Sequence, residues 1–231
     1  MPDFIYFRSL WWIEGNIHPE AKWEEATLPY VLAEGVALDE YEHRADSFNV
    51  HGLWEWENFR VLVYELPLKP HEVCIGTIIK YFNRHCSGVD DTDASILNIG
   101  ATRIRADNSG KEADASFRPM KQRVPESTGS DGMNEPWPNI IVEVAYSESI
   151  DHVFEKVKNY WLKDLSRAHD AIVVKVDPVP EGETPSRMQI NLDCLYHQLY
   201  PGIQVPRDIL PDPIELDFSF VRDEIFRAFR I

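Results

Sequence analysis

Two carboxylates and two lysines fall within one stretch of the chain at positions where they could act together. Asp114 lies in a short run of small residues, and Glu143 interrupts the apolar run of residues 140–145. Lys156 and Lys158 follow in the next amphipathic segment. Carboxylate oxygens bind Mg²⁺ or Mn²⁺, which lower the pKa of a bound water, and an ammonium group stabilises developing negative charge. This combination predicts metal-dependent hydrolysis of phosphodiester bonds.

Glu143 is the more informative of the two carboxylates. Its run, Ile-Ile-Val-Glu-Val-Ala, is typical of a strand buried on both faces, where an ionised glutamate is costly unless a cation or hydrogen-bond donors meet it. Two interpretations are open: Glu143 binds a metal together with Asp114, or the strand bends outward and Glu143 pairs with a structural Lys or Arg. Asp114 alone would also fit a partly exposed strand edge.

A helix is predicted for residues 150–161, because apolar residues recur there at helical spacing. Either Ser147 or Ser149 would cap its first turn. At roughly 100° per residue, Lys156 and Lys158 lie on opposite flanks of the apolar stripe. Either ammonium could reach the end of a neighbouring strand, and the other lysine would then be an ordinary solvated one.

The elements that would position these residues indicate an α/β (α+β) fold with a central mixed sheet flanked by helices. Strands at 139–146 and 171–176 enclose the helix and predict a right-handed crossover. A helix from about residue 71 to 85, closed by Cys86-Ser-Gly, and an exposed loop at 118–138 are also expected. Further strands are predicted at 28–38, 54–66, 95–106 with a return at 113–117, 188–195 and 214–220, and a helix at 220–231.

Composition narrows the class of protein. The chain has 231 residues, 44% of them hydrophobic, without an apolar run long enough to span a membrane, and its three cysteines fit an intracellular location, cytoplasmic or nuclear. The net charge of −16 weakens a nucleic-acid-binding function without excluding it. Residues 1–60 carry twelve acidic and four basic residues, so this part would equally suit a protein-binding surface. We expect an acidic, Trp-rich region at 1–54 packed on a domain at 55–231.

These residues resemble a known family, the Uma2-type branch of the PD-(D/E)XK nuclease superfamily. The resemblance covers roughly residues 55–178. It is carried by Asp114, by Val142-Glu143-Val144-Ala145 with Ser147-Glu148-Ser149, by Glu155-Lys156 and Tyr160, and by Pro70-His71 at the start of the preceding helix. It implies a restriction endonuclease-like core with a divalent-metal site on two central strands.

Carried over by position, Asp114 resembles the motif Asp and Glu143 resembles the acid of Glu-x-Lys. Ala145 stands in place of the motif lysine, a role that Lys156 would supply from the helix, and Ala113 replaces the usual Pro. The resemblance therefore implies catalytic residues Asp114, Glu143 and Lys156, with the metal on the two acids.

The resemblance leaves the residues at some other positions of the family's site open. The N-terminal acid of such sites has two candidates, Glu57 and Glu72. Glu148 would either help to bind metal or cap the helix, and capping is the favoured interpretation. The implied activity is that of a Mg²⁺- or Mn²⁺-dependent endonuclease acting on nucleic acid, expected to be DNA. A homodimer would suit cleavage of two strands.

Two alternatives stay open. The departures at Ala145 and Ala113 also fit a catalytically inactive nuclease-like scaffold, which would bind a protein partner through the acidic N-terminal region. A third interpretation is an unrelated globular protein in which the spacing of Asp114 and Glu143 is coincidental.

Overall fold

The computed structural model describes residues 4–50, 52–101, 103–106, 109–124, 134–163, 168–177 and 187–229. Residues 125–133 of the loop expected at 118–138 therefore lie outside the described part of the chain. None of the described helices is both long and apolar enough to cross a membrane.

A four-stranded mixed sheet forms the centre of the molecule. Its strands run in the order β4 (Ile96–Asn98), β7 (Ala115–Pro119), β8 (Ile140–Ala145) and β9 (Asp170–Lys175). The β4–β7 and β7–β8 pairs are antiparallel, whereas β8 and β9 are parallel. The β8–β9 connection contains helix α4 (Ile150–Lys156) and a π-helical turn, Val157–Trp161. The predicted mixed α/β architecture is confirmed.

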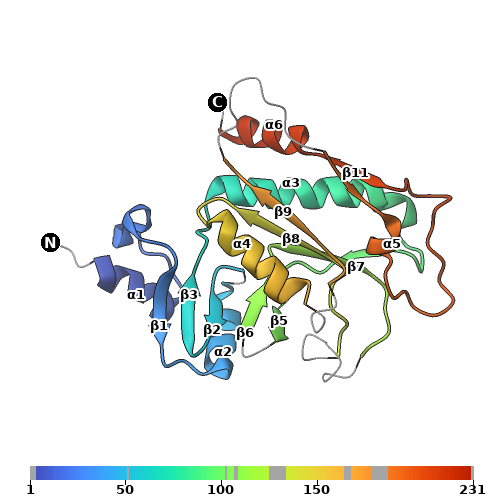
Figure 1. The fold of residues 1–231 in the computed structure, drawn as a ribbon. Coiled ribbons are helices and arrows are strands. Elements are labelled where there is room, and N and C mark those ends of the chain that lie inside the picture. The colour runs from blue at the N-terminus through green and yellow to red at the C-terminus, as the bar shows by residue number, and fades with distance from the viewer. Residues whose placement is uncertain are drawn as a thin grey trace.

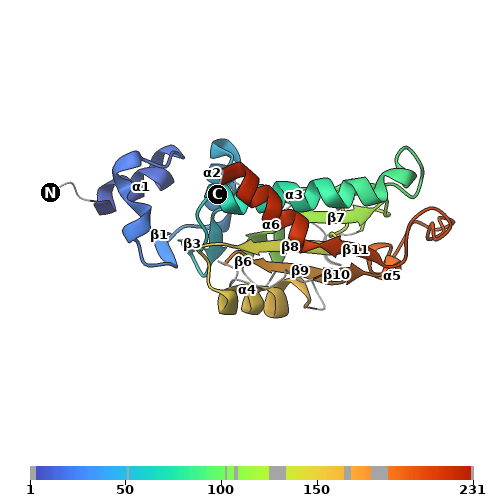
Figure 2. The same ribbon diagram turned by 90° about the horizontal axis from the view of Figure 1, so that it is seen from above.

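Helices cover both faces of this sheet. Helix α3 (Lys69–Cys86), with α6 (Phe218–Phe229) packed against it, covers one face, and α4 covers the other (Figure 2). Pro70 stands in the first turn of α3, where its missing amide hydrogen costs no hydrogen bond. A two-stranded sheet of β10 (Arg187–Ile190) and β11 (Ile214–Asp217), with the short helix α5 (Leu192–Leu195), joins the α3 side.

A second sheet lies at the N-terminal end of the molecule (Figure 1). Its order is β1 (Tyr30–Glu34), β3 (Arg60–Val63), β2 (Glu55–Glu57), β6 (Ser109–Glu112) and β5 (Arg103–Ala106). Helices α1 (Phe4–Glu14) and α2 (Leu38–Phe48) pack here around an aromatic cluster that includes Trp11, Trp23, Trp54 and Trp56. The division into 1–54 and 55–231 stays a prediction. The sheet itself contains strands from both sides of that boundary.

Two predicted strands are each divided into two strands in the structure. The segment 95–106 breaks at Gly100 (φ 61°) into β4 and β5, which belong to different sheets, so that its return strand β7 pairs with β4 and not with β5. The segment 54–66 contains a hairpin, β2–β3, whose turn residues Asn58 and Phe59 both have positive φ, as a type I′ turn requires.

Near the C-terminus, two observed elements also differ from the predicted ones. The segment 188–195 is strand β10 followed by α5. Strand β11 ends at Asp217, and α6 begins at Phe218, two residues earlier than the helix predicted from Phe220. The side chain of Asp217 accepts a hydrogen bond from the Ser219 amide, which satisfies one free donor of the first helical turn.

Candidate active site

Asp114 lies next to strand β8, which carries Glu143. In the β7–β8 register Ala115 is opposite Val142. Asp114 directly precedes β7, and its amide donates to the Val142 carbonyl at 3.1 Å, one residue out of that register, so the chain bulges at this point. Burial is the main cause of the raised pKa of the Glu143 carboxyl, and the Asp114 carboxylate lies close enough to Glu143 to contribute to it.

Asp114 is held from two directions. Its Oδ2 accepts a hydrogen bond of 2.6 Å from the Val144 amide, so the side chain takes the place of a main-chain acceptor at the end of the ladder. Its Oδ1 lies 3.4 Å from Nε2 of His71, in the first turn of α3. Burial alone would lower the pKa of His71, but Asp114 and then Glu72 raise it to about 10, so the imidazole is positively charged at neutral pH.

Glu143 is almost fully buried, with 1% of its surface exposed. Its Oε1 accepts a hydrogen bond from the indole Nε1 of Trp161, and its Oε2 lies 2.7 Å from the Lys156 ammonium. Trp161 ends the π-helical turn, where Leu162 donates to the Val157 carbonyl. Burial raises the pKa of the Glu143 carboxyl to about 8, against the opposing effect of Lys156.

Lys156 is buried at the centre of a group of carboxylates, whereas Lys158 is exposed. Its Nζ lies 2.7, 3.3 and 3.7 Å from carboxylate oxygens of Glu143, Glu55 and Glu148, respectively. Burial alone would lower the pKa of this ammonium, but these carboxylates, Glu143 foremost, hold it well above its usual value. Lys156 therefore stays charged throughout the physiological pH range.

Glu55 reaches the site from the second sheet. It lies on β2 opposite Lys111 of β6, one position beyond the Trp56–Gly110 pair, and its Oε2 contacts the Lys111 ammonium. Lys111 in turn lies 5.9 and 5.8 Å from the ring centroids of Tyr64 and Tyr160. Burial opposes ionisation of Glu55, but Lys111 and then Lys156 lower its pKa well below the usual value.

Glu148 is placed by the loop that follows β8. Glu65 accepts hydrogen bonds from the backbone amides of Tyr146, Ser147 and Glu148, at 2.8 to 3.0 Å. Burial alone would raise the pKa of Glu65, but these bonds and the Ser147 hydroxyl bring it below the usual value. Glu148 itself is 3% exposed, and burial raises the pKa of its carboxyl.

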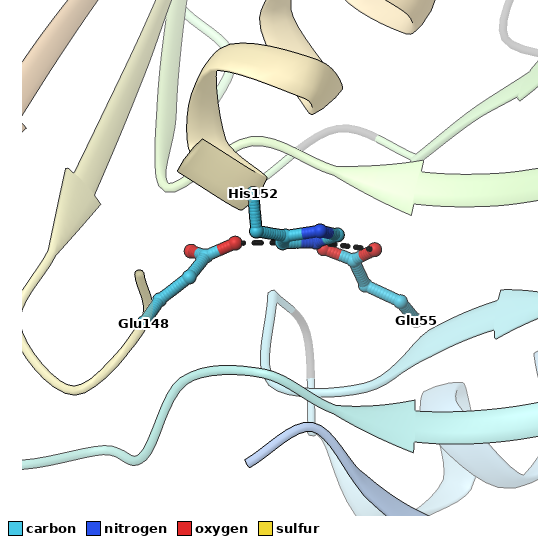
Figure 3. Close-up of side chains that lie close together, drawn as sticks. All are labelled: Glu55, Glu148 and His152. Atoms are coloured by element: carbon cyan, nitrogen blue, oxygen red, sulfur yellow. Dashed lines mark ion pairs between the residues drawn. The ribbon is translucent and has the colours of Figure 1, made fainter. Parts of the chain in front are cut away.

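His152 stands between two of the carboxylates (Figure 3). Its Nε2 lies 3.3 Å from Glu148 Oε1 and 3.8 Å from Glu55 Oε2. One ligand atom from each of these three residues lies within 4.8 Å of the other two, a spacing that fits a divalent metal ion. The Ser149 hydroxyl, which accepts from the His152 amide, caps α4, so capping is not the role of Glu148.

The predicted candidates for the N-terminal acid lie outside the centre of this cluster. Glu72 is exposed and contacts His71, and Glu57 lines the outer cavity beside Lys111. Glu55, two residues before Glu57, lies inside the cluster, with its Oε1 3.3 Å from the Lys156 ammonium. Sequence reasoning passed over Glu55, Lys111 and His152. The alternation Trp-Glu-Trp-Glu at 54–57 was the available signal, since it directs both glutamates to one face of a strand.

Two cavities adjoin the carboxylates. A small one of about 10 Å³, close to the space one water molecule needs, is lined by Glu55, Asp114, Glu148 and Lys156, among others. A larger one of about 340 Å³ opens on the other side of Lys156. Its lining combines three lysines, two tyrosines and four further polar side chains: Lys111, Lys156, Lys163, Tyr64, Tyr160, Glu57, His152, Glu155 and Asn159.

Comparison with known proteins gives a limited result. No family model and no curated protein matches the chain. Among solved structures, the fold is similar to that of a candidate nuclease belonging to DUF820 from Anabaena variabilis ATCC 29413, with 11% sequence identity and a TM-score of 0.46. The alignment covers 74% of this chain and 90% of that one. At this identity the similarity concerns the fold alone.

Proposed function

We propose that the protein is a divalent-metal-dependent nuclease, with Asp114 and Glu143 as metal ligands and Lys156 as the cation that stabilises charge on the scissile phosphate. One observation carries this proposal. Among the described residues, four carboxylates, those of Glu55, Asp114, Glu143 and Glu148, lie around three cationic groups, those of Lys111, Lys156 and His71. Buried acids in such excess are costly unless a further cation neutralises them.

The protonation of the cluster supports the same interpretation. Burial raises the pKa of Glu143 to about 8 and also raises that of Glu148, although Lys156 contacts both carboxylates. Burial therefore outweighs the effect of the Lys156 ammonium on these two carboxyls. Oxygen-rich sites of this type suit Mg²⁺ or Mn²⁺, which retain bound waters and bridge to phosphate oxygens. The small cavity lined by Asp114, Glu55 and Glu148 is of the right size for one ion or water.

The residues of the chain would have distinct roles. When bound, a divalent cation would lower the pKa of a water molecule and offset charge on the phosphate. The Val144 amide and His71 fix the orientation of Asp114. Lys156 stays protonated because of its carboxylate neighbours, so it would donate to a phosphate oxygen rather than deprotonate the attacking water.

The larger cavity supports a nucleic-acid substrate. In a chain of net charge −16, it gathers Lys111, Lys156 and Lys163 beside the carboxylates, and Tyr64 and Tyr160 offer aromatic surface next to them. Ammonium groups meet phosphates and aromatic rings stack on bases. We expect the strand to be bound here, with DNA as the first substrate to test.

The test is cleavage of supercoiled plasmid and of labelled single-stranded DNA in Mg²⁺ and in Mn²⁺. Glu143→Gln and Lys156→Ala are each expected to lose activity by about 1000-fold, as removal of a charge-stabilising group does. Lys158→Ala, which changes an exposed lysine on the same helical segment, is the matched control and should keep wild-type activity. Thermal unfolding of each variant establishes that the proteins are folded.

Two outcomes would contradict the proposal. Cleavage that persists in Glu143→Gln would exclude this carboxylate as a ligand. Equal traces of cleavage in all four proteins would indicate a contaminant. The second outcome would favour the inactive nuclease-like scaffold, and binding partners of the acidic N-terminal region would then be sought.

A further inference from the structure

Two buried polar atoms of the carboxylate cluster lack a hydrogen-bond partner among the described residues. They are Glu148 Oε1 and His152 Nε2, and they face each other at 3.3 Å. Both oxygens of Glu143, by contrast, are engaged by Trp161 and Lys156. Burying unpaired polar atoms is costly, so this pair indicates a missing ligand.

The imidazole of His152 is held in a fixed plane. The ring of Tyr64 stacks on it with centroids 3.6 Å apart and an interplanar angle of 3°. His152 belongs to the first turn of α4, which is anchored by the Ser149 cap. Its Nε2 is thereby directed between Glu148 and Glu55 (Figure 3).

The spacing fits one metal ion. Metal–ligand bonds of about 2.0–2.2 Å to nitrogen and oxygen separate adjacent ligand atoms by roughly 3–4 Å. Nε2 of His152 lies 3.3 and 3.8 Å from the nearest oxygens of Glu148 and Glu55, respectively. All three ligand atoms lie within 4.8 Å of one another. A small movement of the side chains would bring each atom to bonding distance of one ion.

We propose that Glu55, Glu148 and His152 form a second metal site, beside the small cavity that Glu55 and Glu148 share with Asp114, which takes a first-row transition metal such as Mn²⁺ in preference to Mg²⁺. The preference follows from the imidazole nitrogen, because Mg²⁺ favours oxygen ligands and water, whereas Mn²⁺ and the later transition metals accept nitrogen. This site goes beyond the proposed nuclease activity and does not depend on it.

The test is pulsed electron paramagnetic resonance of the protein, first stripped with EDTA and then loaded with Mn²⁺. Coupling of the manganese to the ¹⁴N of a coordinated imidazole is expected in the wild type and should be absent in His152→Ala. The matched control is His43→Ala, which removes an exposed histidine of α2 and should keep the coupling.

Metal affinity gives a second measurement. Calorimetric titration should show Mn²⁺ bound at least about 10-fold more tightly than Mg²⁺ in the wild type. Glu148→Gln and His152→Ala should each weaken Mn²⁺ binding by about 10- to 100-fold or more, since even outer-shell partners have effects of that size. The Mg²⁺ affinity of His152→Ala should change by less than about 3-fold.

The outcomes separate this proposal from the nuclease proposal. Manganese bound without nitrogen coupling in the wild type, or equal Mn²⁺ affinity in His152→Ala, would overturn the second site and would identify His152 as an ion-pair partner of the two glutamates. Nitrogen coupling in a protein that cleaves no nucleic acid would support the second site while contradicting the nuclease. Cleavage supported by Mg²⁺ bears only on the Asp114–Glu143 pair.

Discussion

The two faces of strand β8 are both buried, yet their chemistry differs. The face toward α3 is wholly apolar, with Ile140, Val142 and Val144. The face toward α4 places Glu143 between Ile141 and Ala145. The covering helices account for the difference, because α3 presents apolar side chains such as Phe82 to the sheet whereas α4 delivers Lys156. A buried strand can carry an acid on the face where the helix above it supplies a cation.

The largest effect is expected from a substitution on the side of β8 that faces α4, where Glu143 lies. Lys156→Met removes the ammonium and leaves three carboxylates without it, so it should lower the free energy of unfolding by about 3–5 kcal/mol and abolish activity. Lys158→Met, on the exposed side, should change stability by less than about 0.5 kcal/mol. Urea unfolding of both variants measures the difference. Similar losses in the two would mean that Lys156 does not compensate the acids.

The apolar face can be tested with Phe82→Ala. Phe82 is fully buried and stacks on Phe117 of β7 with ring centroids 4.1 Å apart. Its truncation should lower the free energy of unfolding by about 3 kcal/mol or more. Since the cavity forms on the opposite side of the sheet from Lys156, Mn²⁺ affinity measured by calorimetry should stay at the wild-type value. A change in that affinity would show that the two faces are coupled.

A smaller effect is expected at Glu65, which holds the loop carrying Glu148. Glu65→Gln should lower stability by about 2 kcal/mol at pH 7, because the amide cannot accept all of the hydrogen bonds made by the carboxylate. The pKa of Glu65 lies below its usual value of 4.5 in the folded protein. Its contribution is therefore complete above pH 4.5 and is lost as the pH falls through the folded pKa.

Unfolding midpoints across the acid range measure this contribution. The wild type should lose stability more steeply than Glu65→Gln as the pH falls below 4.5. Parallel pH profiles for the two proteins would contradict the assignment.

The smallest effect on stability is expected at strand β2, which, like β8, has a charged side chain on one face and apolar packing on the other. Glu55 points to the carboxylate cluster, and Trp56 points to the N-terminal aromatic cluster, where its Nε1 donates to the Val36 carbonyl at 2.8 Å. Trp56→Phe should cost about 1 kcal/mol through the lost hydrogen bond. Mn²⁺ binding should be unaffected, and weaker binding would show that the aromatic cluster positions Glu55.

The sequence predicted the centre of the fold well. The continuous apolar run gave β8, and the regular stripe of residues 150–161 gave α4, because burial on two faces and burial on one face leave different periodicities. Asp114 and Glu143 were expected on adjacent strands, and in the structure Glu143 lies on β8 whereas Asp114 directly precedes β7, its amide bonded to the Val142 carbonyl. Lys156 and Lys158 could not be told apart from their spacing, since the choice depends on how α4 is rotated over the sheet.

The other residues of the site are positioned by structural features that the local sequence pattern does not predict. Glu55 reaches Lys156 through a hairpin whose turn contains Phe59 at positive φ, a residue that rarely adopts this conformation. The π-helical turn brings Trp161 to Glu143, and neither its position nor its length follows from apolar spacing. Pairing of β2 with β6 is a contact between segments that are distant in the sequence.

The hydrogen bond from the Val144 amide to Asp114 Oδ2 makes the main chain of β8 a reporter of the site. The amides of a sheet interior exchange with solvent deuterium only when the strands separate. The Val144 amide is protected by a side chain instead, so its exchange rate depends on the position and charge of that one carboxylate. A ligand that draws Asp114 aside would be registered as faster exchange at a single backbone position, without any label in the cavity.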